Sequence, residues 1–327
     1  MRFVEAGGVR LSAIGLGTWQ FGSREWGYGR EYADEESGRI LGRALDLGIN
    51  LIDTAEIYGF GASERIVGRA LAGRRDEAFI ATKIFPVLPV GPVVADRARR
   101  SARRLGVATL DLYQVHQPNP LVPDSLIMPP MQRLVAEGLV RHVGVSNYGL
   151  RRWQAADAAL GGPVLSNQVR FSLVDRRPET ALLPWAQAND RIIIAYSPLG
   201  QGLLSARYDA SNRPGGVRAA NALFLPDNLE RAQELLEALR SVAAAHGATP
   251  AQVALAWVVR RPNVVAIPGA SSVAQLERNA EAADHELTDD EDARLTEASD
   301  RFSPRTGLSA AGDMVRERVR QARSSVS

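Results

Sequence analysis

Eight short apolar runs, each followed by a stretch with helical periodicity, are the sequence feature that most limits the fold of this chain. The runs are Ile14–Thr18, Asn50–Asp53, Phe79–Lys83, Leu110–His116, Val140–Ser146, Val164–Val169, Arg191–Tyr196 and Val264–Ile267. Alternating strands and helices favour parallel strands joined by right-handed crossovers. Eight repeats favour a closed barrel over an open doubly wound sheet. The sequence therefore predicts an α/β fold, a (β/α)8 TIM barrel.

The segments between and around these runs complete the predicted organisation. Helices are expected to begin near Asp34, Ser63, Pro92, Pro129, Gly149, Glu179 and Leu229. Two alternating runs around Gly7-Gly8 predict an N-terminal β-hairpin over residues 2–11. The chain of 327 residues fits one barrel domain, 1–327, with an irregular tail at 301–327 that is either a solvated end or a lid. The long loops 117–130 and 199–228 are expected to shape access to the site.

Composition excludes several classes of function. There is no cysteine, so disulfides, thiolate catalysis and Cys-ligated zinc are excluded, and the chain suits a reducing cytoplasm. The net charge of +2 gives no field that would attract nucleic acid or a membrane surface. No apolar run is long enough to cross a bilayer. With only four histidines, a barrel metallohydrolase is disfavoured, and we expect no metal site.

Polar residues stand at the carboxyl ends of successive predicted strands, where barrel active sites are built. They are Asp53, Lys83, His116, Ser146, Asn147, Gln168 and Tyr196, with Tyr58 in the loop after Asp53. Each alone has an ordinary reading: a cap, a surface lysine, a structural imidazole, a packed phenol. Their combination at one mouth is what indicates chemistry.

The acid, the base, the phenol and the imidazole form a coherent set. A buried Lys83 needs a carboxylate to keep its proton, and Asp53 supplies one. We expect the ammonium to lower the pKa of Tyr58 towards the working range of a general acid. His116 would then hydrogen-bond and orient a carbonyl oxygen. A serine nucleophile with a paired histidine and aspartate is not evident.

At these residues the sequence closely resembles the aldo-keto reductase superfamily, in particular its bacterial and potassium-channel β-subunit-like branch. The resemblance covers about residues 1–300. It is carried by Gly48–Gly59 with Ser63, Glu64 and Gly68, by Ala81–Lys83, Leu112–His116, Gly144–Tyr148 and Tyr196–Gly202, and by Ile267–Ser271 with Gln275 and Asn279.

The resemblance implies a catalytic tetrad and a bound NADPH (NADP+ when oxidised). The implied tetrad is Asp53, Tyr58, Lys83 and His116. The implied cofactor residues are Asp53, Ser146, Asn147, Gln168, Tyr196, Ser197, Leu199, Gly202, Gly269, Ser271, Gln275, Arg278 and Asn279. NADPH would lie across the barrel mouth without a Rossmann fold, and a small-molecule aldehyde or ketone would be reduced. Arg278 departs from the acid common at that position, and it either clamps a 2′-phosphate or is an exposed helix charge.

Aromatic residues near the predicted mouth would contact the substrate. The expected substrate-binding residues are Trp19, Phe21, Phe85 and His116. We expect Trp26 and Tyr28 to pack beneath loops instead. The glycine-rich start, Gly15–Gly22, is a weak dinucleotide fingerprint and fits a barrel strand better. The arginine-rich run 96–104 reads as a solvated helix face rather than a nucleic-acid site.

One alternative function stays open on sequence grounds. The potassium-channel β-subunits share the implied fold and bind NADPH, and they serve largely as accessory partners. The segments 58–64 and 269–271 also resemble that branch. The alternative is therefore an NADPH-binding accessory or regulatory subunit with little turnover.

Overall fold

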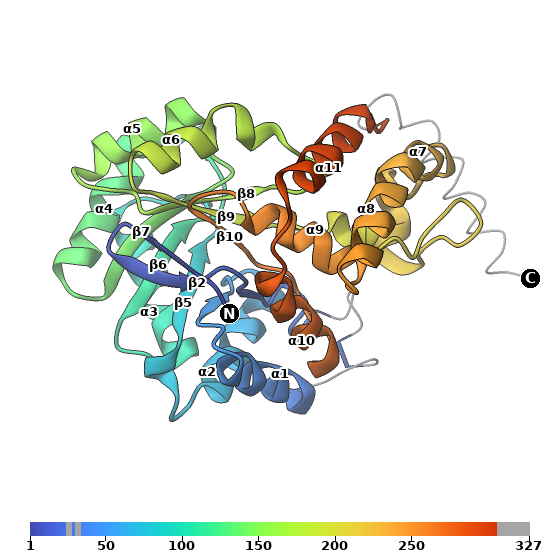
Figure 1. The fold of residues 1–327 in the computed structure, drawn as a ribbon. Helices are drawn as coiled ribbons and strands as arrows, with labels where there is room; N and C mark the ends of the chain where they lie inside the picture. Colours follow the sequence, from blue (N-terminus) through green and yellow to red (C-terminus); the bar gives the residue numbers. More distant parts are fainter. Residues whose placement is uncertain (24–27, 30–33, 306–327) are drawn as a thin grey trace, which may run out of the picture.

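The computed structural model describes residues 1–23, 28–29 and 34–305 of the chain. Eight parallel strands form one sheet in sequence order (Figure 1). They are β3 (Leu16–Gly17), β4 (Leu51–Asp53), β5 (Phe79–Ile84), β6 (Leu110–Val115), β7 (Val140–Ser146), β8 (Ser166–Arg170), β9 (Ile192–Tyr196) and β10 (Val264–Ala266). Parallel bridges from Ile14 to Ala266 and from Gly17 to Gly269 join the first strand to the last. The predicted closed (β/α)8 barrel is confirmed.

The N-terminal hairpin is also confirmed. Strands β1 (Phe3–Ala6) and β2 (Val9–Ser12) pair antiparallel. Gly7 and Gly8 both have positive φ, 59° and 75°, which is the geometry that a two-residue hairpin turn of this twist requires. Leu11 and Ala6 pack with strand residues such as Leu51 and Leu165 inside the barrel. The hairpin therefore covers the amino-terminal end of the strands, opposite the end where a site is expected.

Helices surround the strands in Figure 1 and bury apolar residues against them. They are α1 (Asp34–Asp46), α2 (Ala62–Ala70), α3 (Gly91–Leu105), α4 (Asp124–Ala136), α5 (Leu150–Leu160), α6 (Leu182–Ala188), α7 (Pro226–Arg231), α8 (Gln233–Ala245), α9 (Pro250–Val259), α10 (Val273–Glu281) and α11 (Asp289–Arg301). By length and apolarity no single helix of the described residues could span a membrane, although α8 and α9, which meet at 93°, would qualify as a bent pair.

Two predicted loop and helix boundaries are wrong. Helix α4 begins at Asp124 rather than near Pro129, so the loop after β6 is shorter than predicted and both Pro129 and Pro130 lie inside the helix. Interior prolines disfavour a helix, but Ile127, Met128 and Met131 are completely buried, and this packing outweighs the local penalty. The segment near Glu179 is a short 3-10 turn, and α6 follows it at Leu182.

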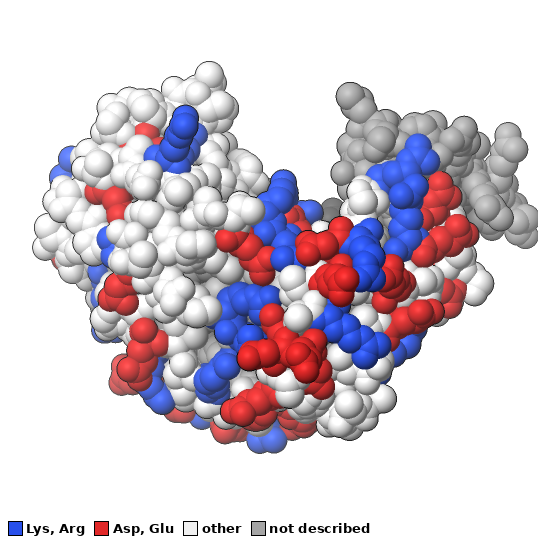
Figure 2. All heavy atoms as spheres, turned by 45° about the horizontal axis from the view of Figure 1, so that its top comes forward, with Lys and Arg blue, Asp and Glu red and all other residues white. Residues whose placement is uncertain are grey.

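Charges on the surface are mixed in sign. Figure 2 shows acidic and basic side chains side by side over much of the face it presents. In the arginine-rich run on α3, Arg97, Arg99, Arg100 and Arg104 each form an ion pair with a carboxylate. This pairing supports the reading of the run as a structural helix face. The one-domain organisation stays a prediction, and the C-terminal tail beyond residue 305 lies outside the described residues.

Candidate active site

The four residues of the predicted tetrad meet at the carboxyl end of the barrel. Asp53 ends β4, Lys83 lies one residue before the end of β5, and His116 directly follows β6. Tyr58 begins the short 3-10 turn that links β4 to α2. Parallel neighbouring strands bring their ends together, which is how residues 30 or more positions apart in sequence come into contact.

Lys83 is the centre of this cluster. Its Nζ donates hydrogen bonds to Asp53 Oδ1 at 2.6 Å, to the Thr54 carbonyl at 2.8 Å and to Tyr58 Oη at 3.2 Å. The side chain is completely buried, and Asp53 is 2% exposed. All three ammonium protons thus have acceptors, which is the condition under which a charge tolerates burial.

The protonation states of Lys83 and Asp53 depend on burial and on their neighbours, which shift each pKa in opposite directions. Burial lowers the pKa of Lys83, but the Asp53 carboxylate and the Tyr58 oxygen raise it more, so the net direction is upward. Burial raises the pKa of Asp53, while Lys83, Gln168 and Gln114 oppose that rise. We infer an ion pair at neutral pH: an ammonium and a carboxylate in a medium where their attraction is strong.

The expected lowering of the pKa of Tyr58 is wrong. Burial raises the pKa of the Tyr58 phenol; Lys83 lowers it in part, and Asp53 raises it further, so the net direction is upward rather than downward. The sequence prediction counted the ammonium but omitted desolvation of the phenolate. Tyr58 is therefore a protonated phenol at rest, with the positive charge 4.9 Å from the centre of its ring.

His116 is partly exposed and lies between two aromatic rings. Its ring makes edge contacts with Tyr58, centroid to centroid 5.7 Å, and with Phe85 at 6.0 Å. Burial, with Lys83 adding to it, lowers the pKa of His116 to about 3. The imidazole is consequently neutral, and its Nδ1 is buried with no hydrogen-bond partner among the described residues. A neutral imidazole offers one N–H donor and one acceptor.

The residues expected to meet the nicotinamide lie at the ends of β7, β8 and β9. Tyr196 Oη donates to Asn147 Oδ1 at 2.9 Å, and Asn147 Nδ2 donates to Ser146 Oγ at 3.0 Å. Gln168 Nε2 donates instead to Asp53 Oδ2 at 2.8 Å, so this amide braces the carboxylate of the ion pair. Sequence reasoning assigned Gln168 only to the cofactor and missed its contact with Asp53.

The loop after β9 has an unusual backbone. Ser197 and Gln201 have positive φ, 50° and 57°, although neither is glycine, and Gly200 and Gly202 are positive as well. Leu199 lies between Ser197 and Gly200 and is partly buried. Non-glycine residues in the left-handed region persist only where the surrounding structure imposes them, and they concentrate at binding sites. Two amides of this loop are paired within it, since Gly200 N donates to the Ser197 carbonyl at 3.0 Å and Gly202 N donates to the Leu199 carbonyl at 2.9 Å.

The segment between β10 and α10 closes the polar side of the mouth. Ser271 N and Oγ both donate to Gln275 Oε1, at 3.0 and 3.1 Å, and Asn279 Nδ2 donates to the Gly269 carbonyl at 3.2 Å. Ser272 caps the helix. A Cβ at Gly269 would lie 2.4 Å from Gln20 Oε1, so a side chain there would displace Gln20. The amino-terminus of α10 offers N–H groups and a positive dipole end to an anion.

Arg278 lies in the last turn of α10, three residues after Gln275, and is exposed. The neighbouring Glu277 pairs with Arg43 at 2.8 Å. The two readings of Arg278, phosphate clamp and exposed helix charge, therefore both stay predictions.

The predicted aromatic walls divide into two groups. Trp19 is 55% exposed and stacks on Tyr58 with ring centroids 5.5 Å apart, and Phe85 lies against His116. The expected contact of Phe21 with substrate is wrong. Phe21 is completely buried in the layer between strands and helices, so it presents no surface to a substrate. Its place in the sequence near the predicted mouth suggested a substrate contact, but the turn at residues 19–22 directs it inward. Tyr28 packs against the core as expected, and Trp26 lies outside the described residues.

Glu56 was missed by sequence reasoning. Its Oε1 accepts a hydrogen bond from Phe85 N at 2.6 Å, and its Oε2 accepts from Arg97 Nε at 2.9 Å. The carboxylate therefore ties the Tyr58 loop to the loop after β5 and to α3. A carboxylate two residues before Tyr58, facing an arginine-rich helix, was the available signal.

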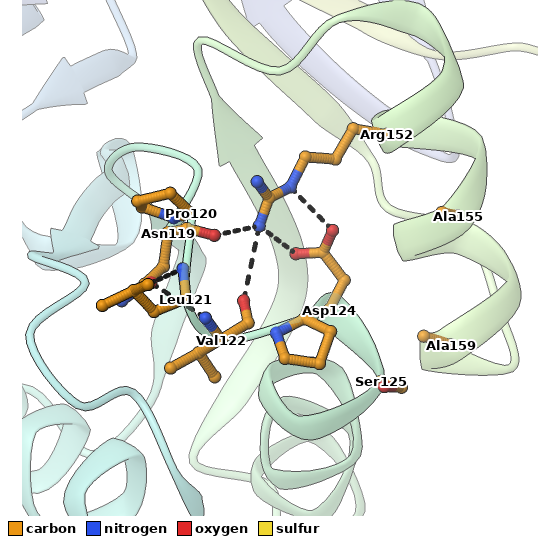
Figure 3. A pocket seen from close by; sticks show the side chains of 10 residues that line it. Asn119, Pro120, Leu121, Val122, Asp124, Ser125, Arg152, Ala155 and Ala159 are labelled. Carbon is orange, nitrogen blue, oxygen red and sulfur yellow. Dashed lines mark hydrogen bonds and ion pairs between the residues drawn. The ribbon is translucent and has the colours of Figure 1, made fainter.

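A hollow of about 500 Å³ lies beside the mouth, between the loop after β6 and α5 (Figure 3). Arg152 crosses it, donating to Asp124 Oδ2 at 2.9 Å and to the Asn119 carbonyl at 2.9 Å. None of the four tetrad residues lines it. Its polar groups satisfy one another, so we assign it to the support of the loop rather than to chemistry. The described residues also contain no group of three or more His, Cys, Asp or Glu that could hold a metal ion.

Comparison with known proteins finds similar chains over almost the whole length. The family model described as "Aldo/keto reductase family" matches residues 13–300. An uncharacterized oxidoreductase of Mycobacterium tuberculosis is 54% identical over 320 residues, covering 98% of this chain and 99% of that protein. The methylglyoxal reductase YeaE of Escherichia coli is 34% identical, covering 90% and 93%. A Klebsiella pneumoniae aldo/keto reductase in complex with NADP and acetate is 32% identical with a TM-score of 0.75, covering 92% and 95%.

Proposed function

This chain belongs to the aldo/keto reductase family, and from that premise we propose that it reduces an aldehyde or ketone to an alcohol with Tyr58 as the proton donor. The observation that carries the proposal is the three-way contact of the Lys83 ammonium with Asp53, Thr54 and Tyr58. Such a contact positions a protonated phenol beside a fixed positive charge at the open end of the barrel. The chain is an NADP-dependent oxidoreductase by its family and its relatives.

The residues on the polar side of the mouth fit such a cofactor. Tyr196 is partly exposed and offers a ring face, and Ser146, Asn147 and Gln168 offer amide and hydroxyl groups beside it. Ser197, Leu199 and Gly202 would hold the cofactor from a tightly turned loop. Gly269, Ser271 and Gln275 lie at or near the amino-terminus of α10, a helix end suited to phosphates, and Asn279 of the same helix donates to the Gly269 carbonyl. Bound NADPH supplies a hydride to the carbonyl carbon. Arg278 would add a bidentate contact to a 2′-phosphate.

The protein's own residues supply the proton and the electrostatics. Tyr58 donates its phenolic proton to the carbonyl oxygen as negative charge develops there. Lys83 stabilises the phenolate that remains, and Asp53 keeps Lys83 charged. His116, neutral because its pKa is about 3, donates one N–H to the same oxygen and fixes its direction. Because these groups are held before substrate arrives, little reorganisation opposes the reaction.

A carbonyl panel tests the proposed function. Purified protein is mixed with NADPH, and with NADH in parallel, and cofactor oxidation is followed for short and long aldehydes, aryl aldehydes, ketones and 2-oxoaldehydes. We expect turnover of at least one class, faster with NADPH. Tight NADPH binding without turnover of any carbonyl would instead support the accessory-subunit alternative.

A cytoplasmic location also remains part of the proposal, since the absence of cysteine suits a reducing compartment.

A further inference from the structure

Exposed apolar side chains are concentrated on one half of the barrel mouth. Among the described residues nine large apolar side chains are exposed, and all but Leu126 and Val135 lie on the loops after β3, β4, β5 and β6. We call these seven the apolar rim: Trp19, Ile57, Phe60, Val87, Leu88, Val90 and Leu121. Single exposed apolar residues are ordinary, so the observation to explain is that seven of them lie on four consecutive loops of the mouth.

Two members of the apolar rim also have a strained backbone. Phe60 is 93% exposed with φ of 53°, and Leu88 is 67% exposed with φ of 46°. Bulky residues rarely adopt the left-handed region, and neither side chain gains burial that would offset the strain. Strain that the fold itself does not use is typical of residues kept for a ligand.

The rim loops are held in place by polar contacts. Arg97, already bound to Glu56, also donates to the Val87 carbonyl at 3.3 Å. Asn119 Nδ2 donates to the Pro86 carbonyl at 2.7 Å, which ties the loop after β6 to the loop after β5. The turn at Gly59 packs so closely on Gly22 that a Cβ there would lie 2.9 Å from its carbonyl oxygen. The exposed side chains therefore stand on a fixed base.

The apolar rim is continuous with the reacting groups. Trp19 belongs to it and stacks on Tyr58, with ring centroids 5.5 Å apart. Phe85 lies against His116 and precedes Val87 and Leu88 by a few residues in the same loop. A carbonyl whose oxygen lies between Tyr58 and His116 would thus have aromatic rings of these loops beside it.

We propose that the apolar rim binds the hydrocarbon body of the substrate, so that the preferred substrates are aldehydes or ketones with an extended aliphatic or aryl group, and that Phe60 and Leu88 determine this preference. The inference rests on the proposed function, since it places the carbonyl at the tetrad. It commits to a substrate rather than to a second copy of the chain because the surface is continuous with Tyr58 and His116.

A chain-length series tests the proposal. Straight-chain aldehydes from propanal to octanal are reduced with saturating NADPH by wild type, F60A, L88A and the double variant. For wild type we expect kcat/KM to rise about fourfold per added methylene along the longer members, as burial of a methylene predicts. In the double variant this slope should flatten, so that octanal loses about tenfold through KM while propanal stays within twofold.

Two controls keep the result specific. L126A removes an apolar side chain that is 54% exposed on α4, outside the apolar rim, and should leave the slope unchanged. F60G permits the left-handed backbone, so it should keep or raise Tm while reducing octanal turnover as F60A does. These outcomes together support the assignment of Phe60.

Three results would overturn it. One is an unchanged slope in the double variant, and another is an equal loss for propanal and octanal. A third is a wild-type dimer that becomes monomeric in the double variant while the wild-type slope is flat, which would assign the apolar rim to a second copy of the chain. Turnover of propanal by wild type in any of these cases leaves the proposed function standing, whereas no aldehyde turnover at all removes both proposals.

Discussion

The two halves of the barrel mouth differ in the side chains that they expose. The loops after β3 to β6 carry the apolar rim, whereas the ends of β7 to β10 carry hydroxyl, amide and glycine positions. Both halves contain non-glycine residues with positive φ: Phe60 and Leu88 on the apolar half, Asn147, Ser197 and Gln201 on the polar half.

Under the proposed function, the polar half would bind the cofactor and the apolar half the substrate, so one scaffold would keep two ligands apart. On the polar half the functional groups bind one another, as Tyr196 does Asn147 and Ser271 does Gln275, so they are positioned before a cofactor arrives. On the apolar half the loops are positioned by ion pairs and amides beneath them. The buried pair of Lys83 and Asp53 lies on β5 and β4, and Gln168 from the polar half donates to Asp53, so this contact is the junction between the halves. The comparison predicts that each half can be altered separately, whereas the junction cannot.

Removing the Lys83 charge at the junction should have the largest effect, a loss in the free energy of unfolding. K83M leaves Asp53 buried without a counter-ion, and we expect a loss of about 3–5 kcal/mol in the free energy of unfolding. Urea denaturation measures it. The matched control is R100M, which removes an exposed pair with Asp96 and should change stability by less than about 1 kcal/mol. Adding D53N to K83M should restore part of the loss, and no restoration would argue against an ion pair.

The imidazole at the junction gives a pH prediction of intermediate size. An unfolded histidine takes up a proton near pH 6.5, whereas folded His116 stays neutral down to about pH 3. The unfolded chain therefore binds more protons between these values, and stability falls as pH falls through that window. Between pH 7 and pH 5 wild type should lose about 2 kcal/mol more than H116N in urea denaturation. If the free energy of unfolding of the two proteins instead changes equally with pH, folded His116 has an ordinary pKa and the prediction is wrong.

The smallest effect should separate the two halves. On the polar half R278A should raise the Kd of NADPH about tenfold and leave that of NADH within twofold, because it removes a charge-assisted contact to the 2′-phosphate. Cofactor fluorescence titration measures both. F60A on the apolar half and R103A, an exposed arginine of α3, should leave both Kd values unchanged. Equal binding of NADPH by R278A and wild type would make Arg278 an ordinary exposed helix charge.

Sequence reasoning predicted the barrel and the convergence of the four residues at one mouth for a physical reason. The alternation of apolar runs and amphipathic stretches is repeated often enough to fix the topology, and strand ends of a barrel must converge. Asp53, Lys83 and His116 could be placed from this rule alone.

What the sequence could not supply depends on packing between distant segments. The pKa of Tyr58 follows from desolvation, which needs the burial of the folded protein. The start of α4 follows from contacts of Ile127 and Met131 that outweigh Pro129. The inward direction of Phe21 and the contact of Gln168 with Asp53 likewise depend on loop geometry that no periodicity records.

The replacement of Tyr58 by phenylalanine tests the central claim most directly, because it removes only the hydroxyl that accepts from Lys83. Hydride transfer in Y58F is measured in a single turnover with a substrate found in the carbonyl panel, alongside NADPH affinity by fluorescence. We expect the rate to fall by about 10²- to 10⁴-fold, the range for loss of a general acid, with the NADPH Kd unchanged. A wild-type rate in Y58F with the cofactor bound normally would contradict the account.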